Sequence, residues 1–135
     1  MKKKLLILGV APNLIIDKNF IEIEKRFNRE KFEYNLLVTK NYKNELVDKY
    51  VGFPNDFIKE NMIFDFSGYD KIIVCQCRDL RTDFLNVYLF LKNNGVTKTN
   101  VIYNNNKIGV FNLKRLNKLN LYLYKFLSFY KKLGF

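Results

Sequence analysis

Residues suited to ligand binding stand at the ends of the apolar runs of this sequence. The candidate substrate-binding residues are Gly9, Asn13, Gln76, Arg78, Asp79, Asn104 and Asn105. An arginine such as Arg78 can hold a carboxylate or a phosphate through two parallel hydrogen bonds. Plainer interpretations are also open, because Gly9 can be a packing glycine, Asp79 a helix N-cap and Asn104 part of an asparagine-rich turn.

No familiar catalytic or metal centre can be assembled from these residue types. Histidine is absent, which excludes Ser-His-Asp and Cys-His nucleophile systems and any histidine-ligated metal. The two cysteines, Cys75 and Cys77, are too few for a disulfide framework or a metal site, so we expect two buried thiols. The loop at residues 9–13 contains one glycine and matches neither the dinucleotide-binding fingerprint nor the P-loop. We therefore expect no cofactor and no metal, while the catalytic residues, and enzymatic activity itself, stay open.

Five segments predict the strands that would position these residues. They are residues 5–10, 32–39, 62–66, 71–76 and 100–103. Residues 5–10 and 72–75 are continuous apolar runs, as in strands that are covered on both faces, and we expect them to be buried, parallel neighbours. The carboxyl ends of such strands are where open α/β sheets bind their ligands.

Helical patterns alternate with these strands. The first predicted helix has an apolar face of Phe20, Ile23 and Phe27, and Asn19 with a glutamate three residues later resembles a capping box at its start. Residues 45–51 can form a short helix.

A further helix should follow residues 71–76 and end at Asn94-Gly95. Its predicted buried face consists of Leu80, Phe84, Val87, Tyr88 and Leu91. The whole alternation predicts one Rossmann-like, three-layer α/β domain over residues 1–135, with a mostly parallel sheet.

A basic and aromatic helix is expected within residues 113–133. Its apolar stripe, which we expect to face the sheet, consists of Leu116, Leu119, Leu123, Phe126, Leu127, Tyr130 and Leu133. Outside this stripe lies a candidate membrane or partner surface of Lys114, Lys118, Tyr122, Tyr124, Lys125, Phe129 and Lys132. This surface fits an anionic membrane interface or a further domain or subunit, and the alternative is a core helix that is buried on two sides.

The formal net charge of +11 predicts attraction to polyanions, although the lysines are spread along the chain and can also reflect biased composition. No sequence signature of a nucleic-acid-binding fold is present, so nucleic acid is disfavoured as a partner. The basic start followed by residues 5–11 imitates a signal peptide, but Pro12 ends the run and no cleavage pattern follows. We expect a cytoplasmic protein that lies peripherally on the inner face of the membrane.

Several segments carry a family resemblance through their order. An apolar strand runs into a glycine-containing loop at residues 5–13, and a strand, polar turn and helix follow at residues 72–95. An aromatic strand at residues 101–103 precedes residues 107–113, which are similar to a W-G-x-D-L-Y segment, and then the basic helix. This arrangement resembles the amino-terminal half of GT-B glycosyltransferases, in particular the 4-acetamido-4,6-dideoxygalactose transferases of enterobacterial common antigen synthesis.

The resemblance implies an acceptor-side domain in cell-surface glycan synthesis at the cytoplasmic membrane face. Gly109 and Leu113 are compatible with the family pattern, whereas its Trp, Asp and histidines are not matched, so no catalytic residue is carried over. The expected partners are a nucleotide sugar and a polyprenyl-linked glycan, reached through a second domain or subunit, and the chain alone is expected to be inactive. The alternative is a non-enzymatic, basic Rossmann-like module that binds a partner protein, an anionic membrane or nucleic acid.

Overall fold

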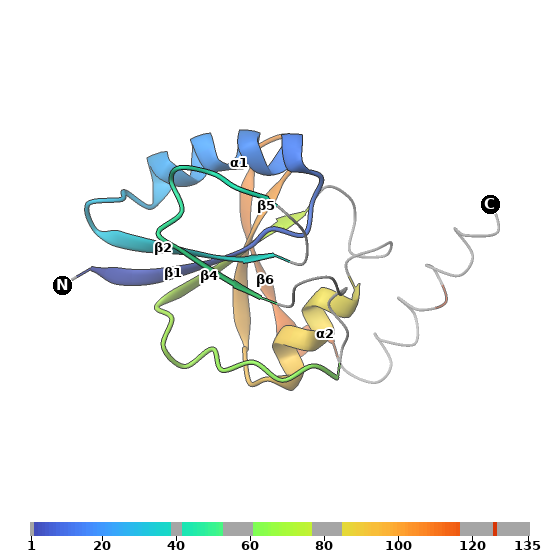
Figure 1. Ribbon diagram of the computed structural model, residues 1–135. Helices are drawn as coiled ribbons and strands as arrows, with labels where there is room; N and C mark the ends of the chain where they lie inside the picture. Colours follow the sequence, from blue (N-terminus) through green and yellow to red (C-terminus); the bar gives the residue numbers. More distant parts are fainter. Residues whose placement is uncertain (1, 39–41, 53–60, 77–84, 117–125, 127–135) are drawn as a thin grey trace.

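The computed structural model describes residues 2–38, 42–52, 61–76, 85–116 and 126 of the chain. These residues form a six-stranded sheet with one helix on each face, which confirms the predicted α/β class (Figure 1). The elements are β1 (Lys3–Leu8), α1 (Asn13–Arg26), β2 (Phe32–Val38), β3 (Lys49–Gly52), β4 (Lys71–Gln76), α2 (Leu85–Asn93), β5 (Lys98–Tyr103), β6 (Ile108–Asn112) and the 3₁₀ turn η1 (Leu113–Arg115).

The sheet is mostly parallel, as predicted. Its strand order is β3-β2-β1-β4-β5-β6, in which the first five strands are parallel and β6 is antiparallel to β5. β1 and β4 lie side by side at the centre, which confirms that the two most apolar runs are parallel neighbours. Leu5 and Ile7 pack on the α1 side and Leu6 and Leu8 on the α2 side, because successive strand residues point to opposite faces.

Helix α1 begins earlier than its predicted capping box. Pro12 holds the N-cap position without a side-chain cap, and its carbonyl accepts hydrogen bonds from the amides of Ile15 and Ile16 at 3.0 and 3.1 Å. Asn19 therefore lies inside the helix, and the predicted capping box at Asn19 is wrong. A proline is tolerated at a helix start because the first amides have no intrahelical partner. The predicted apolar face is confirmed, since Phe20, Ile23 and Phe27 are all buried.

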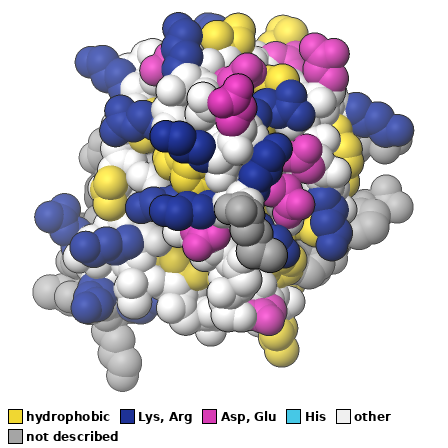
Figure 2. All heavy atoms as spheres, turned by 90° about the vertical axis from the view of Figure 1, so that its left-hand side faces the viewer, with side chains coloured by type: hydrophobic (Ala, Val, Ile, Leu, Met, Phe, Trp, Pro, Cys, Tyr) yellow, Lys and Arg dark blue, Asp and Glu magenta, His cyan; other side chains and the backbone are white. Residues whose placement is uncertain are grey.

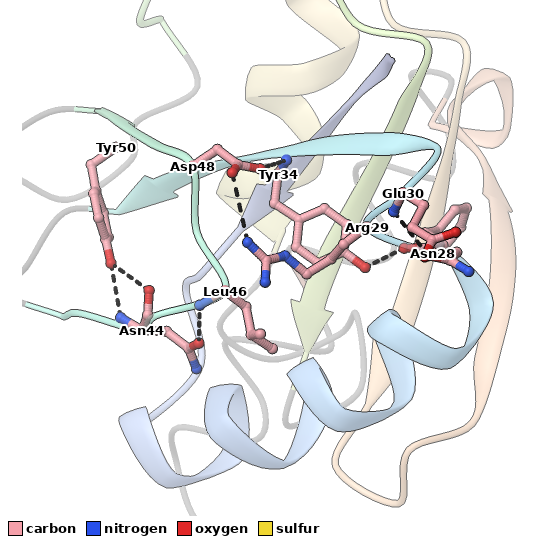
Figure 3. A network of polar contacts seen from close by, with 9 residues as sticks. Asn28, Arg29, Glu30, Tyr34, Asn44, Leu46, Asp48 and Tyr50 are labelled. Atoms are coloured by element: carbon pink, nitrogen blue, oxygen red, sulfur yellow. Dashed lines mark hydrogen bonds and ion pairs between the residues drawn. The ribbon is translucent and has the colours of Figure 1, made fainter. Parts of the chain in front are cut away.

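Residues 49–52 form the edge strand β3, so the short helix predicted at residues 45–51 is wrong. The side chain of Asp48 accepts a hydrogen bond from the amide of Tyr34 at 2.8 Å, and the Asp48 amide donates to the Tyr34 carbonyl at 2.9 Å (Figure 3). Arg29 pairs with the same carboxylate at 3.7 Å. These contacts align β3 with β2, and the aromatic and β-branched residues Tyr50 and Val51 suit a strand.

Residues 62–66 contain no strand, which contradicts a further prediction. Phe64 and Phe66 instead pack on Phe90 of α2, with ring centroids 6.4 and 5.4 Å apart. The side chain of Asn94 fixes this segment by accepting from the Phe64 amide at 3.1 Å and donating to the Met62 carbonyl at 2.8 Å. Aromatic burial against a helix has replaced strand pairing here.

The carboxyl end of α2 and the hairpin after it are only partly as predicted. Gly95, with φ of +89°, ends α2 as expected, and the Val96 amide bonds to the Leu91 carbonyl at 3.1 Å. Strand β6, which the sequence analysis did not predict, pairs with β5 through an asparagine-rich turn in which Asn106 has φ of +64°.

In the part of the chain that the structure describes, no helix is long and apolar enough to cross a membrane.

Candidate functional site

The strand order creates a switch point between β1 and β4. The chain leaves β1 through α1 toward β2, and it leaves β4 through α2 toward β5, so the two connections diverge to opposite sides and opposite faces (Figure 1). In open α/β sheets the crevice at the carboxyl ends of two such strands is the usual ligand site. We call this end of the sheet the carboxyl edge.

Gly9 follows β1 at this edge and is closely packed. Its amide donates to the Leu37 carbonyl at 2.9 Å, which extends the pairing of β1 with β2. A Cβ atom on Gly9 would stand 3.1 Å from side-chain atoms of both Leu36 and Val38. The packing interpretation of Gly9 therefore accounts for the absence of a side chain without any ligand.

Gln76 ends β4 and is only 3% exposed. Its Oε1 atom accepts a hydrogen bond from the hydroxyl of Tyr88, a fully buried residue of α2. Burial raises the pKa of Tyr88 above its ordinary value, and the neighbouring Tyr103 and Cys75 contribute in the same direction. Gln76 thus joins β4 to α2, and Tyr88 acts as a neutral hydrogen-bond donor.

Three of the predicted residues are exposed at the carboxyl edge. Asn13 is the first residue of α1, and Asn104 and Asn105 stand in the turn between β5 and β6. The side chain of Asn105 accepts from the Lys107 amide at 3.1 Å and so supports the turn. Arg78 and Asp79, which the sequence places after β4, lie outside the described residues.

Asn19 is a residue of this edge that the sequence analysis assigned to a helix cap. Its amide nitrogen donates to the Tyr103 carbonyl at 3.1 Å and to Oδ1 of Asn106 at 3.0 Å, which fastens α1 to the β5–β6 turn. The residue is fully buried, and its Oδ1 has no hydrogen-bond partner. Its helical spacing could have indicated that it is buried, because Asn19 falls on the buried stripe between Ile16 and Ile23.

Tyr42 lies behind the carboxyl end of β2 and meets the first turns of α1. Its hydroxyl donates to Asp17 and accepts from the side-chain nitrogen Nδ2 of Asn44 at 3.1 Å. Burial and the hydrogen bond to Asp17 raise the pKa of Tyr42 above its ordinary value. Tyr42 therefore stays protonated at neutral pH, and its hydroxyl links Asp17 of α1 to Asn44.

The thiol of Cys75 is buried, as predicted, whereas Cys77 lies outside the described residues. Burial raises the pKa of Cys75 to about 12, so the thiol is neutral at physiological pH. Only the thiolate is an effective nucleophile, so Cys75 does not serve as one in this state. No group of three or more potential metal ligands occurs in the described parts of the chain.

The structure describes only part of the predicted membrane or partner surface. Lys114 is exposed in η1, while Lys118, Tyr122, Tyr124, Lys125, Phe129 and Lys132 lie outside the described residues. Leu116 of the predicted apolar stripe is buried, but Phe126 is 56% exposed. Phe126 thus does not have the buried position that the stripe predicted for it.

An open hollow of about 690 Å³ lies at the opposite end of the sheet, where β4 and β5 begin. Residues 64–67, 69–72 and 94–100 line it, together with Val110. Two of its polar side chains hold the fold, since Asn94 binds the 62–64 segment and Asp70 accepts from the Lys4 amide at 2.8 Å. The carboxyl edge is therefore the better candidate for specific recognition of a small molecule.

No family model matches this sequence, and neither the curated proteins nor the solved structures contain a match. The candidate site therefore depends on its own geometry. At the carboxyl edge that geometry offers exposed amide side chains, together with neutral and buried tyrosine and cysteine groups.

Proposed function

We propose that this chain is a glycosyltransferase-like, acceptor-side amino-terminal domain, acting in cell-surface glycan synthesis at the cytoplasmic membrane face. The observation that carries the proposal is the switch point between β1 and β4, with exposed asparagines at the same edge of the sheet. Asparagine amides both donate and accept hydrogen bonds, which suits the hydroxyl groups of a sugar. Arg78 and Asp79 follow β4 in the sequence, and in this proposal they supply a phosphate-binding and a hydroxyl-binding group.

The described side chains at this edge favour a binding half over a complete catalytic centre. Cys75, Tyr42 and Tyr88 all have raised pKa values and stay neutral near pH 7. Sugar transfer also requires that the donor nucleotide sugar be held in line with the acceptor. In this proposal a second domain or subunit supplies that donor site.

The purified 135-residue chain should accordingly show no sugar transfer. Incubation with UDP- and dTDP-linked sugars and an acceptor glycan should release no nucleoside diphosphate above the rate without protein. Product analysis by mass spectrometry provides the measurement. Steady turnover by this chain alone would contradict the assignment of a donor-free half.

Binding of glycan should depend on the β5–β6 turn. Asn104→Ala should weaken binding to oligosaccharides on a glycan array by about three- to tenfold, because one hydrogen bond contributes about 0.5–1.5 kcal/mol. Asn104 is exposed, so the fold should not change. The matched control is Asn61→Ala, an exposed asparagine before the 62–66 segment. Equal binding by the two variants, or no glycan binding by the native chain, would count against the proposal.

A basic binding module is the second candidate function. The observation that favours it is a set of exposed lysines at the edge of the sheet opposite the carboxyl edge. That surface can be tested independently of sugar binding.

A further inference from the structure

Every parallel strand of the sheet begins at a lysine or directly after one. The amino-edge lysines are Lys3, Lys4, Lys31, Lys49, Lys71 and Lys98. Parallel strands start at the same end of the sheet, which we call the amino edge, so these residues form a staggered row across five strands, in which Lys71 aligns with Leu5 and Lys49 with Asn35. Figure 2 shows the side of the molecule where the strands begin, with Lys and Arg side chains over the face and carboxylates among them.

The amino-edge lysines are exposed and free of ion pairs. Within the described residues, the two ion pairs are Lys25–Glu22 and Arg29–Asp48, and neither uses the row. The nearby carboxylate of Asp70 accepts a hydrogen bond from the Lys4 backbone amide instead of pairing with a lysine side chain. The ammonium groups therefore remain available to an external anion.

Other cations extend this edge. Helix α1 runs back along the sheet and ends with Lys25 and Arg26. The Leu113 amide donates to the Thr97 carbonyl at 2.9 Å, so η1, with the exposed Lys114, joins the sheet where β5 begins.

We propose that the amino edge of the sheet is a docking surface for an anionic lipid membrane. Besides the charge, the large apolar side chains Ile63 and Val110 are 87% and 71% exposed. Val110 lines the hollow with Lys71 and Lys98, and Ile63 directly precedes that lining at Phe64. Apolar side chains beside lysines suit the boundary between headgroups and acyl chains, whereas sites for single-stranded nucleic acid combine a basic groove with exposed aromatic rings on which bases stack.

This inference rests on the membrane location in the proposed function and not on sugar transfer. With the amino edge on the lipid, the carboxyl edge points away from the membrane. A strand of six residues spans about 20 Å, so the ligand crevice would stand about that far from the lipid surface. Membrane docking and ligand binding can then occur together.

The test uses two variants of the full chain with equal charge. The amino-edge variant is Lys31→Gln, Lys71→Gln and Lys98→Gln, and the control is Lys18→Gln, Lys43→Gln and Lys107→Gln, three exposed lysines toward the carboxyl edge. Both lose three positive charges, so a non-specific attraction would fall equally. Co-sedimentation is measured with vesicles of phosphatidylcholine mixed with phosphatidylglycerol, and with phosphatidylcholine alone.

The native chain should bind the mixed vesicles, bind neutral vesicles weakly, and detach as salt is raised. The amino-edge variant should bind the mixed vesicles about 100-fold more weakly, because each lysine near an anionic surface contributes about fivefold in affinity. The affinity of the control should fall much less. Equal losses, or no binding by the native chain, would overturn the proposal. Binding of single-stranded DNA is measured for the same proteins. If the amino-edge variant still binds vesicles but loses DNA binding while the control does not, the surface binds nucleic acid and the membrane proposal is overturned. Circular dichroism verifies folding, and glycan binding by the same variants reports separately on the sugar site.

Discussion

The variant Asn19→Asp should lower the free energy of unfolding by about 3–5 kcal/mol at pH 7, because a buried charge without a partner is among the most costly substitutions. The Asn19 amide nitrogen donates to two oxygens, the Tyr103 carbonyl and Oδ1 of Asn106. A carboxylate has no hydrogen to donate and would place its charge against both oxygens. In the folded variant the pKa of the new carboxyl group must therefore rise well above its unfolded value of about 3.9.

The pH dependence of this variant has a definite sign. Between the unfolded and the folded pKa, the folded chain binds more protons than the unfolded chain, so stability falls as the pH rises through that window. Below about pH 3.9 the carboxyl group is protonated in both states, and most of the difference from the native chain should disappear. Urea unfolding of both proteins, compared at neutral pH and near pH 4, measures the change.

The matched control is Asn13→Asp. Asn13 is exposed at the first position of α1, where an added negative charge is neutral or slightly favourable because of the helix dipole. We expect the stability of this control to change by less than about 1 kcal/mol. A loss in Asn19→Asp that is small, or that persists unchanged near pH 4, would show that the Asn19 contacts with the β5–β6 turn do not hold α1 in place.

The central part of the fold could be predicted because its strands are apolar on both sides. The runs that became β1 and β4 have no polar alternation, and only a position between two layers buries both faces. The buried face of α1 was likewise apparent from the helical spacing of its aromatic and aliphatic residues. Local pattern and tertiary environment agree in these elements.

The peripheral elements depend on partners that a local pattern does not reveal. Strand β3 exists because Asp48 and the open edge of β2 align it, and residues 64–66 are irregular because their rings are buried on Phe90. Strand β6 depends on the turn at Asn106, whose positive φ an asparagine tolerates more readily than most residues. Each of these outcomes is a tertiary effect on a short segment.

The sequence predicted the position of the candidate site better than the roles of its residues. The sequence placed Asn13, Asn104 and Asn105 at strand ends, and the structure has them exposed at the carboxyl edge. Gln76, by contrast, is used in the core by Tyr88, which is distant in the sequence. A polar residue at a strand end can serve either a ligand or a neighbouring helix, and spacing along one strand does not distinguish the two.

If both proposed surfaces operate, they restrict the acceptor. The crevice would stand about 20 Å from the lipid, roughly the length of a six-residue strand. A lipid-linked acceptor would then need a glycan long enough to cross that distance, or a carrier that lifts its sugar from the headgroups. Lipid-linked oligosaccharides should accordingly bind better than lipid-linked monosaccharides when the native chain is docked on anionic vesicles.

Replacing Gly52 with alanine should be about as damaging as the loss of a buried side chain, although Gly52 lies at the end of an edge strand. Gly52 has φ of +141°, a conformation that L residues rarely adopt, and a Cβ atom there would stand 2.2 Å from the Val38 carbonyl oxygen. Neither the angle nor that contact can be relieved by turning a side chain, so β3 must shift away from β2. We expect Gly52→Ala to lower the free energy of unfolding by about 2–4 kcal/mol.

The same change should have a local signature in hydrogen exchange. Amide protection of Lys49, Tyr50 and Val51 should fall, since these residues pair with β2, while protection in the central β1 and β4 should change only as far as global stability does. The matched control is Gly68→Ala, because a Cβ atom on Gly68 would meet nothing within 4 Å. If Gly52→Ala is no more destabilising than Gly68→Ala, or leaves the protection of β3 intact, then the close approach of Gly52 to Val38 does not determine how β3 pairs with the sheet.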